Sequence, residues 1–335
     1  MYGALLGDMI GAPYEFDRGN KSKKFPLFCE NSRFTDDSVM TIAVAEALLD
    51  SRFLDDDSIR AALIKSMRKW GKKYPDAGYG RKFLCWLREK DPKPYGSCGN
   101  GSAMRVSPCA WVEDSSACVS EAKLPGRCRE LAWLSADVTH SHPEGLKGAM
   151  ATADAIFLCR CYFGDSSMES SEKKRLIKEH IEREYGYDLS KTLDEIRPSY
   201  RFDVSCQGSV PQAITAFLES TDFEDAIRNA ISIGGDSDTV AAITGSMAEA
   251  AYGIPDKGKD VFLSGRAAES RSETLGRVYR SVRRQIKQSA LAVFPLFDYD
   301  INAKGVVMFS EKFICAGYEY TDYTFHVPAP YFRKT

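Results

Sequence analysis

Residues 234–251 read GGDSDTVAAITGSMAEAA, a glycine turn followed by an acidic helix start and an apolar run. The start places two carboxylates and a hydroxyl side by side, on Asp236, Asp238 and Thr239. These residue types favour the first turn of a helix, and the two glycines let the backbone turn tightly before it. Because the run at 241–251 is rich in alanine, neighbouring helices can approach it closely. The stretch therefore predicts a central helix of an α-helical core.

Helical spacing extends over most of the chain. Apolar residues recur at i, i+3, i+4 and i+7 in ten segments, and clear β alternation is absent before residue 290. We therefore predict an all-α fold, a compact orthogonal bundle of many helices formed by one domain over residues 1–290. The predicted helices lie near 36–50, 57–73, 79–89, 127–140, 144–163, 171–185, 211–220, 223–232, 238–252 and 273–290, with another over 103–112.

The last 45 residues have a different character. Short aromatic and β-branched runs alternate with Asp, Asn, Gly and Pro over residues 291–335. We expect a short β or irregular appendage that packs on the helical domain, because aromatic side chains mostly serve to bury area.

The charge of the chain is nearly balanced, with 45 basic and 47 acidic residues and a formal net charge of −2. Such a balance creates no general attraction to nucleic acid or to an anionic membrane, so a phosphate-bearing ligand has to be held locally. The first eight residues contain no basic leader, and the ten cysteines form no CxxC pair. We expect a soluble, cytoplasmic monomer or small homo-oligomer with free thiols.

A second acidic helix start mirrors the first. Residues 34–39 read FTDDSV and lead into the apolar run 40–49, so Thr35, Asp36 and Asp37 occupy a predicted first turn. We call residues 34–39 the first acidic motif and residues 234–240 the second acidic motif. Either motif alone is explained by helix capping. An EF-hand is excluded because the twelve-residue loop ending in Glu is missing.

Two motifs of the same composition predict more than capping. If the two helix starts meet, four carboxylates converge, and their repulsion raises the pKa values unless cations intervene. Oxygen ligands without neighbouring His or Cys favour Mg²⁺, Mn²⁺ or Ca²⁺ over zinc. The pair therefore predicts a site for two divalent cations.

Five segments carry a resemblance to the ADP-ribosylglycohydrolases, the family of the dinitrogenase-reductase-activating glycohydrolase and the ADP-ribosyl-acceptor hydrolases. They occur in the family's order and span residues 3 to about 255. They are GALLGDMIGAPYE at 3–15, TDDS at 35–38, GNGSAMR at 99–105, THSHP at 139–143 and GGDSDT at 234–239.

The resemblance implies an all-α fold and two Mg²⁺ or Mn²⁺ ions. Carried over by position, Thr35, Asp36 and Asp37 with Asp238 hold one ion. Asp236, Asp238 and Thr239 with Asp36 hold the other. All six positions retain oxygen ligands, which argues against a metal-free structural relative.

The resemblance also assigns substrate and proton-transfer residues. The small-residue loop at 96–102, which alone indicates only a turn, resembles the family's ADP-ribose-contacting loop. Its substrate residues are Ser97, Gly99, Asn100, Gly101, Ser102 and Met104. His142 is preferred over His140 for the ribose pocket, although both suit a structural role at a helix end. Glu15 matches a mobile acid over the metals, and Asp8 lies on the first helix as a partner of the metal site.

The implied activity is hydrolysis of the glycosidic bond between the distal ribose of ADP-ribose and an acceptor, with an ADP-ribosylated protein as the substrate. Asp36, Asp37, Asp238 and Glu15 are the expected catalytic residues, and arginine is the first choice of acceptor. Two alternatives stay open: hydrolysis of a free ADP-ribosyl small molecule or nucleotide sugar, and a non-catalytic member that binds ADP-ribose. The segment 165–208 matches the family less clearly.

Overall fold

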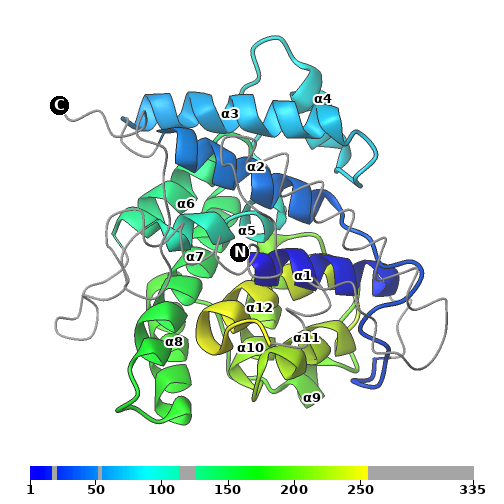
Figure 1. Cartoon of the computed structure of the whole chain (residues 1–335), viewed down its shortest axis with the longest axis vertical. Helices are drawn as coiled ribbons and strands as arrows, with labels where there is room; N and C mark the ends of the chain where they lie inside the picture. Colours follow the sequence, from blue (N-terminus) through cyan, green and yellow to red (C-terminus); the bar gives the residue numbers. More distant parts are fainter. Residues whose placement is uncertain (17–20, 52–54, 113–125, 256–335) are drawn as a thin grey trace, which may run out of the picture.

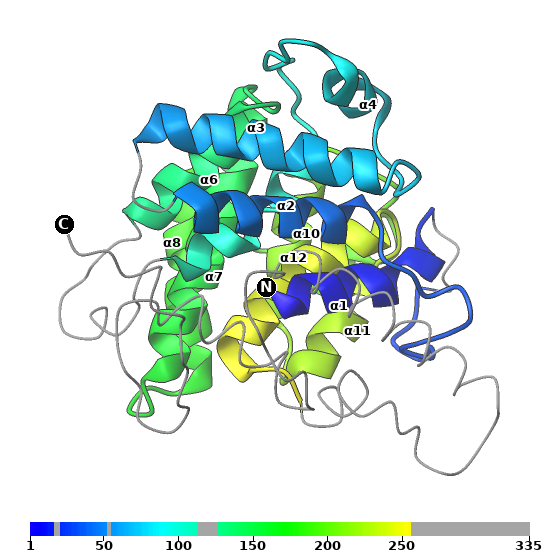
Figure 2. The ribbon, with the colours of Figure 1, turned by 45° about the horizontal axis from the view of Figure 1, so that its top comes forward.

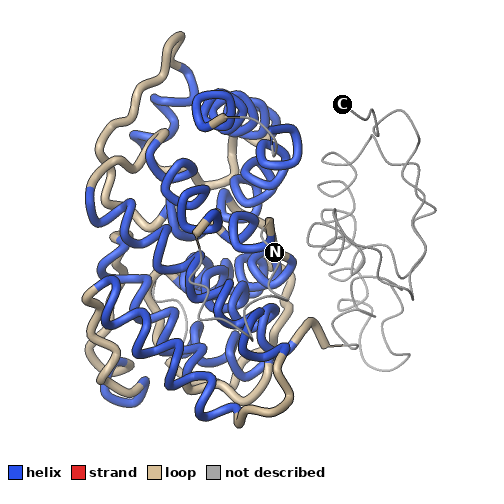
Figure 3. Tube along the Cα trace, turned by 90° about the vertical axis from the view of Figure 1, so that its left-hand side faces the viewer, coloured by secondary structure: helices blue, strands red, loops and turns tan. Residues whose placement is uncertain are grey.

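A computed structural model of the chain describes residues 1–16, 21–51, 55–112 and 126–255, and within these ranges it contains helices and loops with a single isolated β-bridge (Figure 3). No helix in the described ranges is long and apolar enough to cross a membrane. The α-helices are α1 (Tyr2–Gly11), α2 (Asp36–Ser51), α3 (Asp56–Lys73), α4 (Arg81–Arg88), α5 (Gly101–Met104), α6 (Arg127–Asp137), α7 (Pro143–Gly164), α8 (Ser170–Tyr185), α9 (Leu193–Ile196), α10 (Cys206–Leu218), α11 (Phe223–Ser232) and α12 (Ser237–Tyr252). Two 3₁₀ helices, η1 (Ala12–Tyr14) and η2 (Ser107–Trp111), complete the set.

Helices α1 and α12 lie side by side and run in opposite directions (Figures 1 and 2). Three glycines of α1, at positions 3, 7 and 11, face the backbone of α12. A Cβ atom added at Gly3 would lie 2.0 Å from the carbonyl oxygen of Gly245, and one at Gly7 would lie 2.0 Å from that of Ala241. Only glycine permits this approach. The three glycines therefore determine the distance between α1 and α12, including the distance between the end of α1 and the start of α12.

The two alanine-rich helices α7 and α12 are largely buried, as the sequence predicts. Helix α12 contacts α1, α7, α10 and α11, and α2 packs between α1 and α3 (Figure 2). Small side chains at the centre therefore let several helices reach the same core.

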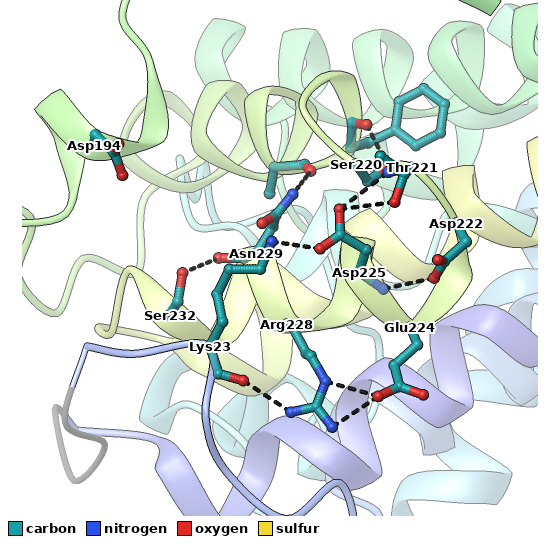
Figure 4. Close-up of polar contacts among 12 residues, drawn as sticks. Lys23, Asp194, Ser220, Thr221, Asp222, Glu224, Asp225, Arg228, Asn229 and Ser232 are labelled. Atoms are coloured by element: carbon teal, nitrogen blue, oxygen red, sulfur yellow. Dashed lines mark hydrogen bonds and ion pairs between the residues drawn. The ribbon is translucent and has the colours of Figure 1, made fainter.

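Polar contacts tie the loop before the first acidic motif to α11, the helix that precedes the second (Figure 4). Arg228 of α11 donates to the backbone carbonyls of Lys23 and Phe25 at 2.8 and 2.9 Å. The ammonium group of Lys23 pairs with Asp225 of the same helix. Exposed ion pairs contribute little free energy, but these contacts hold the two chain segments that lead into the acidic motifs against each other.

Several helix boundaries differ from the prediction. The single helix predicted over 103–112 is wrong, because the chain forms α5, then a break, then η2, which has Pro108 in its first turn. Proline has no N–H to continue a helix from the preceding turn. Helix α10 begins at Cys206 rather than at 211, since Ser205 caps it and Pro211 is accommodated inside. The predicted helix at 273–290 and the appendage at 291–335 lie outside the described residues.

Candidate metal centre

The two acidic motifs meet. The hydroxyl of Thr239 donates to Asp37 Oδ2 at 3.3 Å, across 202 residues of sequence. Asp8, Asp37 and Asp238 each offer a carboxylate oxygen, and these three atoms lie within 4.8 Å of one another. Glu15, Asp236 and Asp238 form a second group with the same spacing. Asp238 belongs to both groups, so the carboxylates form one continuous cluster.

Asp8 joins α1 to the start of α2. Its Oδ2 accepts hydrogen bonds from the backbone N–H of Thr35 at 2.9 Å, from that of Ser38 at 3.0 Å and from the Ser38 hydroxyl. Its Oδ1 accepts from the Thr35 hydroxyl at 2.8 Å. The shortest contact of the Thr35 hydroxyl is the one to Asp8, and its oxygen accepts from the Asp37 backbone N–H at 3.4 Å, so one lone pair stays available to a cation. The predicted role of Asp8 as a partner of the metal site stays a prediction.

Burial raises the pKa of Asp36 well above its ordinary value, and the nearby Asp238 and Asp8 raise it further, although Asp36 belongs to neither group. Its backbone N–H donates to the carbonyl of Ala77 at 2.8 Å, and a Cβ added at Gly78 would lie 3.2 Å from its Oδ1. Gly78 has a φ of 109°, a left-handed conformation that favours glycine. The segment around Gly78 therefore covers Asp36 closely, and the sequence offers no signal for it because the contact is tertiary.

The carboxylates raise one another's pKa values. Burial raises the pKa of Asp37 well above its ordinary value, and the nearby Asp238 raises it further. Burial and Asp236 do the same to the pKa of Asp238, and burial raises that of Asp236 to about 6. Like charges in a buried site disfavour ionisation. The cluster is therefore unstable as a set of bare anions.

A divalent cation fits this cluster. Asp37 Oδ1 is buried and has no hydrogen-bond partner among the described residues. A buried carboxylate oxygen without a partner is costly unless an ion fills that role. The donors are carboxylates and threonine hydroxyls, which suit hard cations such as Mg²⁺ and Mn²⁺.

The substrate loop predicted at 96–102 borders the cluster. The side-chain amide of Asn100 donates to Asp236 Oδ2 at 2.7 Å and to the Ser209 hydroxyl at 2.9 Å. Gly99 forms the isolated bridge with Ser205, which leads into α10. The sequence did not identify Ser209, because its role depends on α10 lying beside the loop.

The other predicted loop residues have defined places. The Ser97 hydroxyl accepts from the Gly99 backbone N–H at 3.0 Å, and the buried Ser102 hydroxyl donates to the carbonyl of Gly145 at 2.8 Å. Met104 packs in the hydrophobic core at the end of α5. Gly101 begins α5. Among the predicted loop residues, the contact with the carboxylate cluster comes from Asn100, whereas Ser102 and Met104 are buried away from solvent.

The two histidines of the THSHP segment occupy different environments. His142 is exposed and caps α7, its Nδ1 accepting from the Glu144 backbone N–H at 3.1 Å. His140 is buried, and a Cβ added at Gly101 would lie 3.1 Å from its Nε2. The preference for His142 stays a prediction, and the structure places His140 against Gly101 of the predicted substrate loop.

Comparisons with known proteins identify the family of the chain. A family model described as ADP-ribosylglycohydrolase matches residues 1–280. The chain is 27% identical over 323 residues to the ADP-ribosylhydrolase ARH3 of Bos taurus, covering 75% of this chain and 83% of that protein. It is 25% identical over 281 residues to the ADP-ribosylarginine hydrolase Tri1 of Pseudomonas putida, covering 76% and 70%.

A solved structure, described as an ADP-ribosylglycohydrolase-related protein complex, has the same fold. The TM-score is 0.55 at 23% sequence identity, over 85% of this chain and 95% of that chain. The likeness confirms the predicted all-α fold. Since the family model covers most of the chain, the protein belongs to the ADP-ribosylglycohydrolase family, whose members hydrolyse linkages to ADP-ribose.

Proposed function

We propose that this protein releases ADP-ribose from a modified arginine side chain of a protein, and that it does so with two divalent cations, Mg²⁺ or Mn²⁺. The observation that carries the proposal is the approach of the two acidic motifs, with Thr239 and Asp37 in hydrogen-bond contact. Arginine is favoured as the acceptor because Tri1 is described as a hydrolase of ADP-ribosylarginine.

Two overlapping ligand sets would hold the cations. Thr35, Asp36, Asp37 and Asp238 form one set, and Asp36, Asp236, Asp238 and Thr239 form the other. The unpartnered Asp37 Oδ1 and the cluster's raised pKa values support this assignment. When bound, such cations polarise ribose hydroxyls and lower the pKa of a water molecule.

The protein's own residues then perform three tasks. The backbone and hydroxyls of the loop at 96–102 bind the diphosphate, with His140 or His142 beside the ribose. Asp37, Asp238 or Glu15 accepts the proton of the attacking water and returns one to the departing group. The bond that breaks joins the anomeric carbon of the distal ribose to the acceptor, and the closely placed carboxylates stabilise positive charge on that carbon.

A substrate panel tests the proposal. The purified chain is incubated with peptides ADP-ribosylated on arginine or serine, with ADP-ribosylated nucleic acid and with a nucleotide sugar. Release of the ribosyl product is measured with Mg²⁺, with Mn²⁺ and with EDTA. We expect release from the arginine peptide and its loss in EDTA. Asp36→Asn and Asp238→Asn should each lower the rate about 100-fold or more, since bound cations contribute several kcal/mol of transition-state stabilisation.

Asp57→Asn is the matched control, because Asp57 is an exposed first-turn acid of α3 outside the cluster. Unchanged release by both cluster variants would refute the two-cation site. Release of ADP-ribose from another substrate of the panel, and not from the arginine peptide, would show that arginine is not the acceptor. Calorimetry with ADP-ribose completes the test. If the protein binds ADP-ribose but hydrolyses no substrate of the panel, it is a non-catalytic ADP-ribose-binding member and the proposed activity is wrong.

A further inference from the structure

The buried histidine beside the substrate loop has two distinct edges. His140 is 5% exposed, and its Nδ1 lies 2.7 Å from the hydroxyl of Thr139. Its Nε2 faces the glycines of the loop, since added Cβ atoms at Gly101 and Gly99 would lie 3.1 and 3.6 Å from it. A side chain at either position would contact Nε2, so the two glycines keep this edge of the ring free of side chains from positions 99 and 101.

The Thr139 hydroxyl is itself constrained by a buried arginine. Arg105 is 1% exposed and donates through one terminal nitrogen to the carbonyl of Ser135 and to Thr139 Oγ1, both at 2.7 Å. A guanidinium group has no acceptor, so the Thr139 oxygen must accept from it. The hydroxyl's single proton then has two possible acceptors, His140 Nδ1 at 2.7 Å and the carbonyl of Ala136 at 3.4 Å. The shorter contact favours the imidazole.

We infer that Thr139, oriented by Arg105, holds His140 as the neutral tautomer that carries its proton on Nε2. His140 then donates a hydrogen bond through Nε2 to an oxygen of the ligand at the loop, and Arg105 and Thr139 are positioning residues for this contact. The identity of the ligand rests on the proposed function. The tautomer is inferred from the contacts among Arg105, Thr139 and His140 and does not depend on that function.

The electrostatic surroundings agree with a neutral ring. Burial lowers the pKa of His140 well below its ordinary value, and the nearby positive charge of Arg105 lowers it further. The opposite tautomer would direct a lone pair at the phosphate oxygens of the ligand, which are acceptors themselves. A proton on Nε2 can donate a hydrogen bond to such an oxygen. The position of that proton is set by Thr139 and not by any residue of the loop.

Nitrogen-15 NMR of the full-length, histidine-labelled protein tests the tautomer directly. The spectrum, assigned with His140→Gln, should show a protonated Nε2 and an unprotonated Nδ1 for His140. A protonated Nδ1 in the wild-type protein would overturn the inference. Thr139→Val should change the tautomer ratio, and Thr139→Ser should keep it.

Calorimetry with ADP-ribose supplies the functional readout. Thr139→Val should weaken binding about 10-fold, the size expected for one hydrogen bond to an anionic ligand, while Mg²⁺ affinity stays unchanged. Thr139→Ser should restore the affinity. Thr152→Val is the matched control, because Thr152 is equally buried and its hydroxyl has no partner among the residues described. Equal loss in the Val and Ser variants would contradict the role of Thr139.

The two proposals fail differently. If the wild-type protein does not bind ADP-ribose, the proposed function fails, and the NMR result still decides the tautomer. If ADP-ribose binds and His140 carries its proton on Nδ1, the inference fails and the proposed function stands.

Discussion

The hydroxyl of Thr239 lies 3.3 Å from a carboxylate oxygen of Asp37, although 202 residues of sequence separate them. The contact joins the first turn of α12 to the first turn of α2. The first turns of α2 and α12 also contact α1. Asp8 of α1 accepts hydrogen bonds at the start of α2, and a Cβ atom added at Gly11 of α1 would lie 2.6 Å from the Cα atom of Asp238 in α12. The cluster is therefore a junction of three helices, so a substitution there should affect both the stability of the fold and the affinity for cations.

Removing the charge of Asp37 should separate these two properties. Without cations, Asp37→Asn should be more stable than the wild-type protein, because it removes one of several mutually repelling buried anions. With Mg²⁺ at 100 times the wild-type Kd, it should lack the roughly 2.7 kcal/mol that ligand binding contributes to folding. Thermal unfolding with and without Mg²⁺ measures both effects. Asp57→Asn, the exposed control, should respond to Mg²⁺ as the wild type does.

The stability gained from cations should depend on pH. The pKa of Asp236 is raised to about 6, whereas an aspartate in the unfolded chain has a pKa of about 3.9. The native, cation-free protein therefore binds more protons than the unfolded chain between these values, and its stability falls as the pH rises through about 6. Cations replace these protons, so the increase in Tm on adding Mg²⁺ should grow between about pH 5 and pH 8. A pH-independent increase would contradict a cation site at these carboxylates.

Asp8 should influence cation binding without being required as a ligand. Asp8→Asn replaces an oxygen that accepts hydrogen bonds at Thr35 with an NH₂ donor, so the Thr35 hydroxyl loses its orientation. We expect Mg²⁺ affinity to fall about 10- to 100-fold, the usual effect of losing a group that orients a metal ligand. Calorimetric titration measures it. Asp55→Asn is the control, since Asp55 also accepts from a helix N–H, that of Ser58 at 2.9 Å. Its Mg²⁺ affinity should stay at the wild-type value.

The contact between α1 and α12 should tolerate no added methyl group. A Cβ at Gly7 would lie 2.0 Å from the carbonyl oxygen of Ala241, so Gly7→Ala must separate the two helices. We expect a loss of about 1–3 kcal/mol in the free energy of unfolding, although alanine favours a helix by about 1 kcal/mol over glycine. Denaturant unfolding measures the change. Gly164→Ala, at the exposed end of α7 where no atom lies within 4 Å of the added Cβ, should be neutral or stabilising.

Local signals predicted most of the helices well. Residues that cap, start or stop a helix act within one turn: Pro143 begins α7, and Gly186 and Gly253 directly follow α8 and α12. The errors came where a neighbour compensates for an unfavourable residue. Helix α10 begins at Cys206, capped by Ser205, and contains Pro211 in its interior, so its start lies five residues before the predicted one.

By itself the sequence determined that the chain is helical and that two of its helices begin with acids, because helix periodicity and capping depend on residues a few positions apart. Only the tertiary structure decided that Asp37 and Thr239 touch, that Asp236 accepts a hydrogen bond from Asn100, and that His140 lies against the glycines of the loop. These relationships depend on how closely α1 and α12 pack and on which helix covers which loop. Such long-range distances follow from the packing of the whole core, and no local pattern records them.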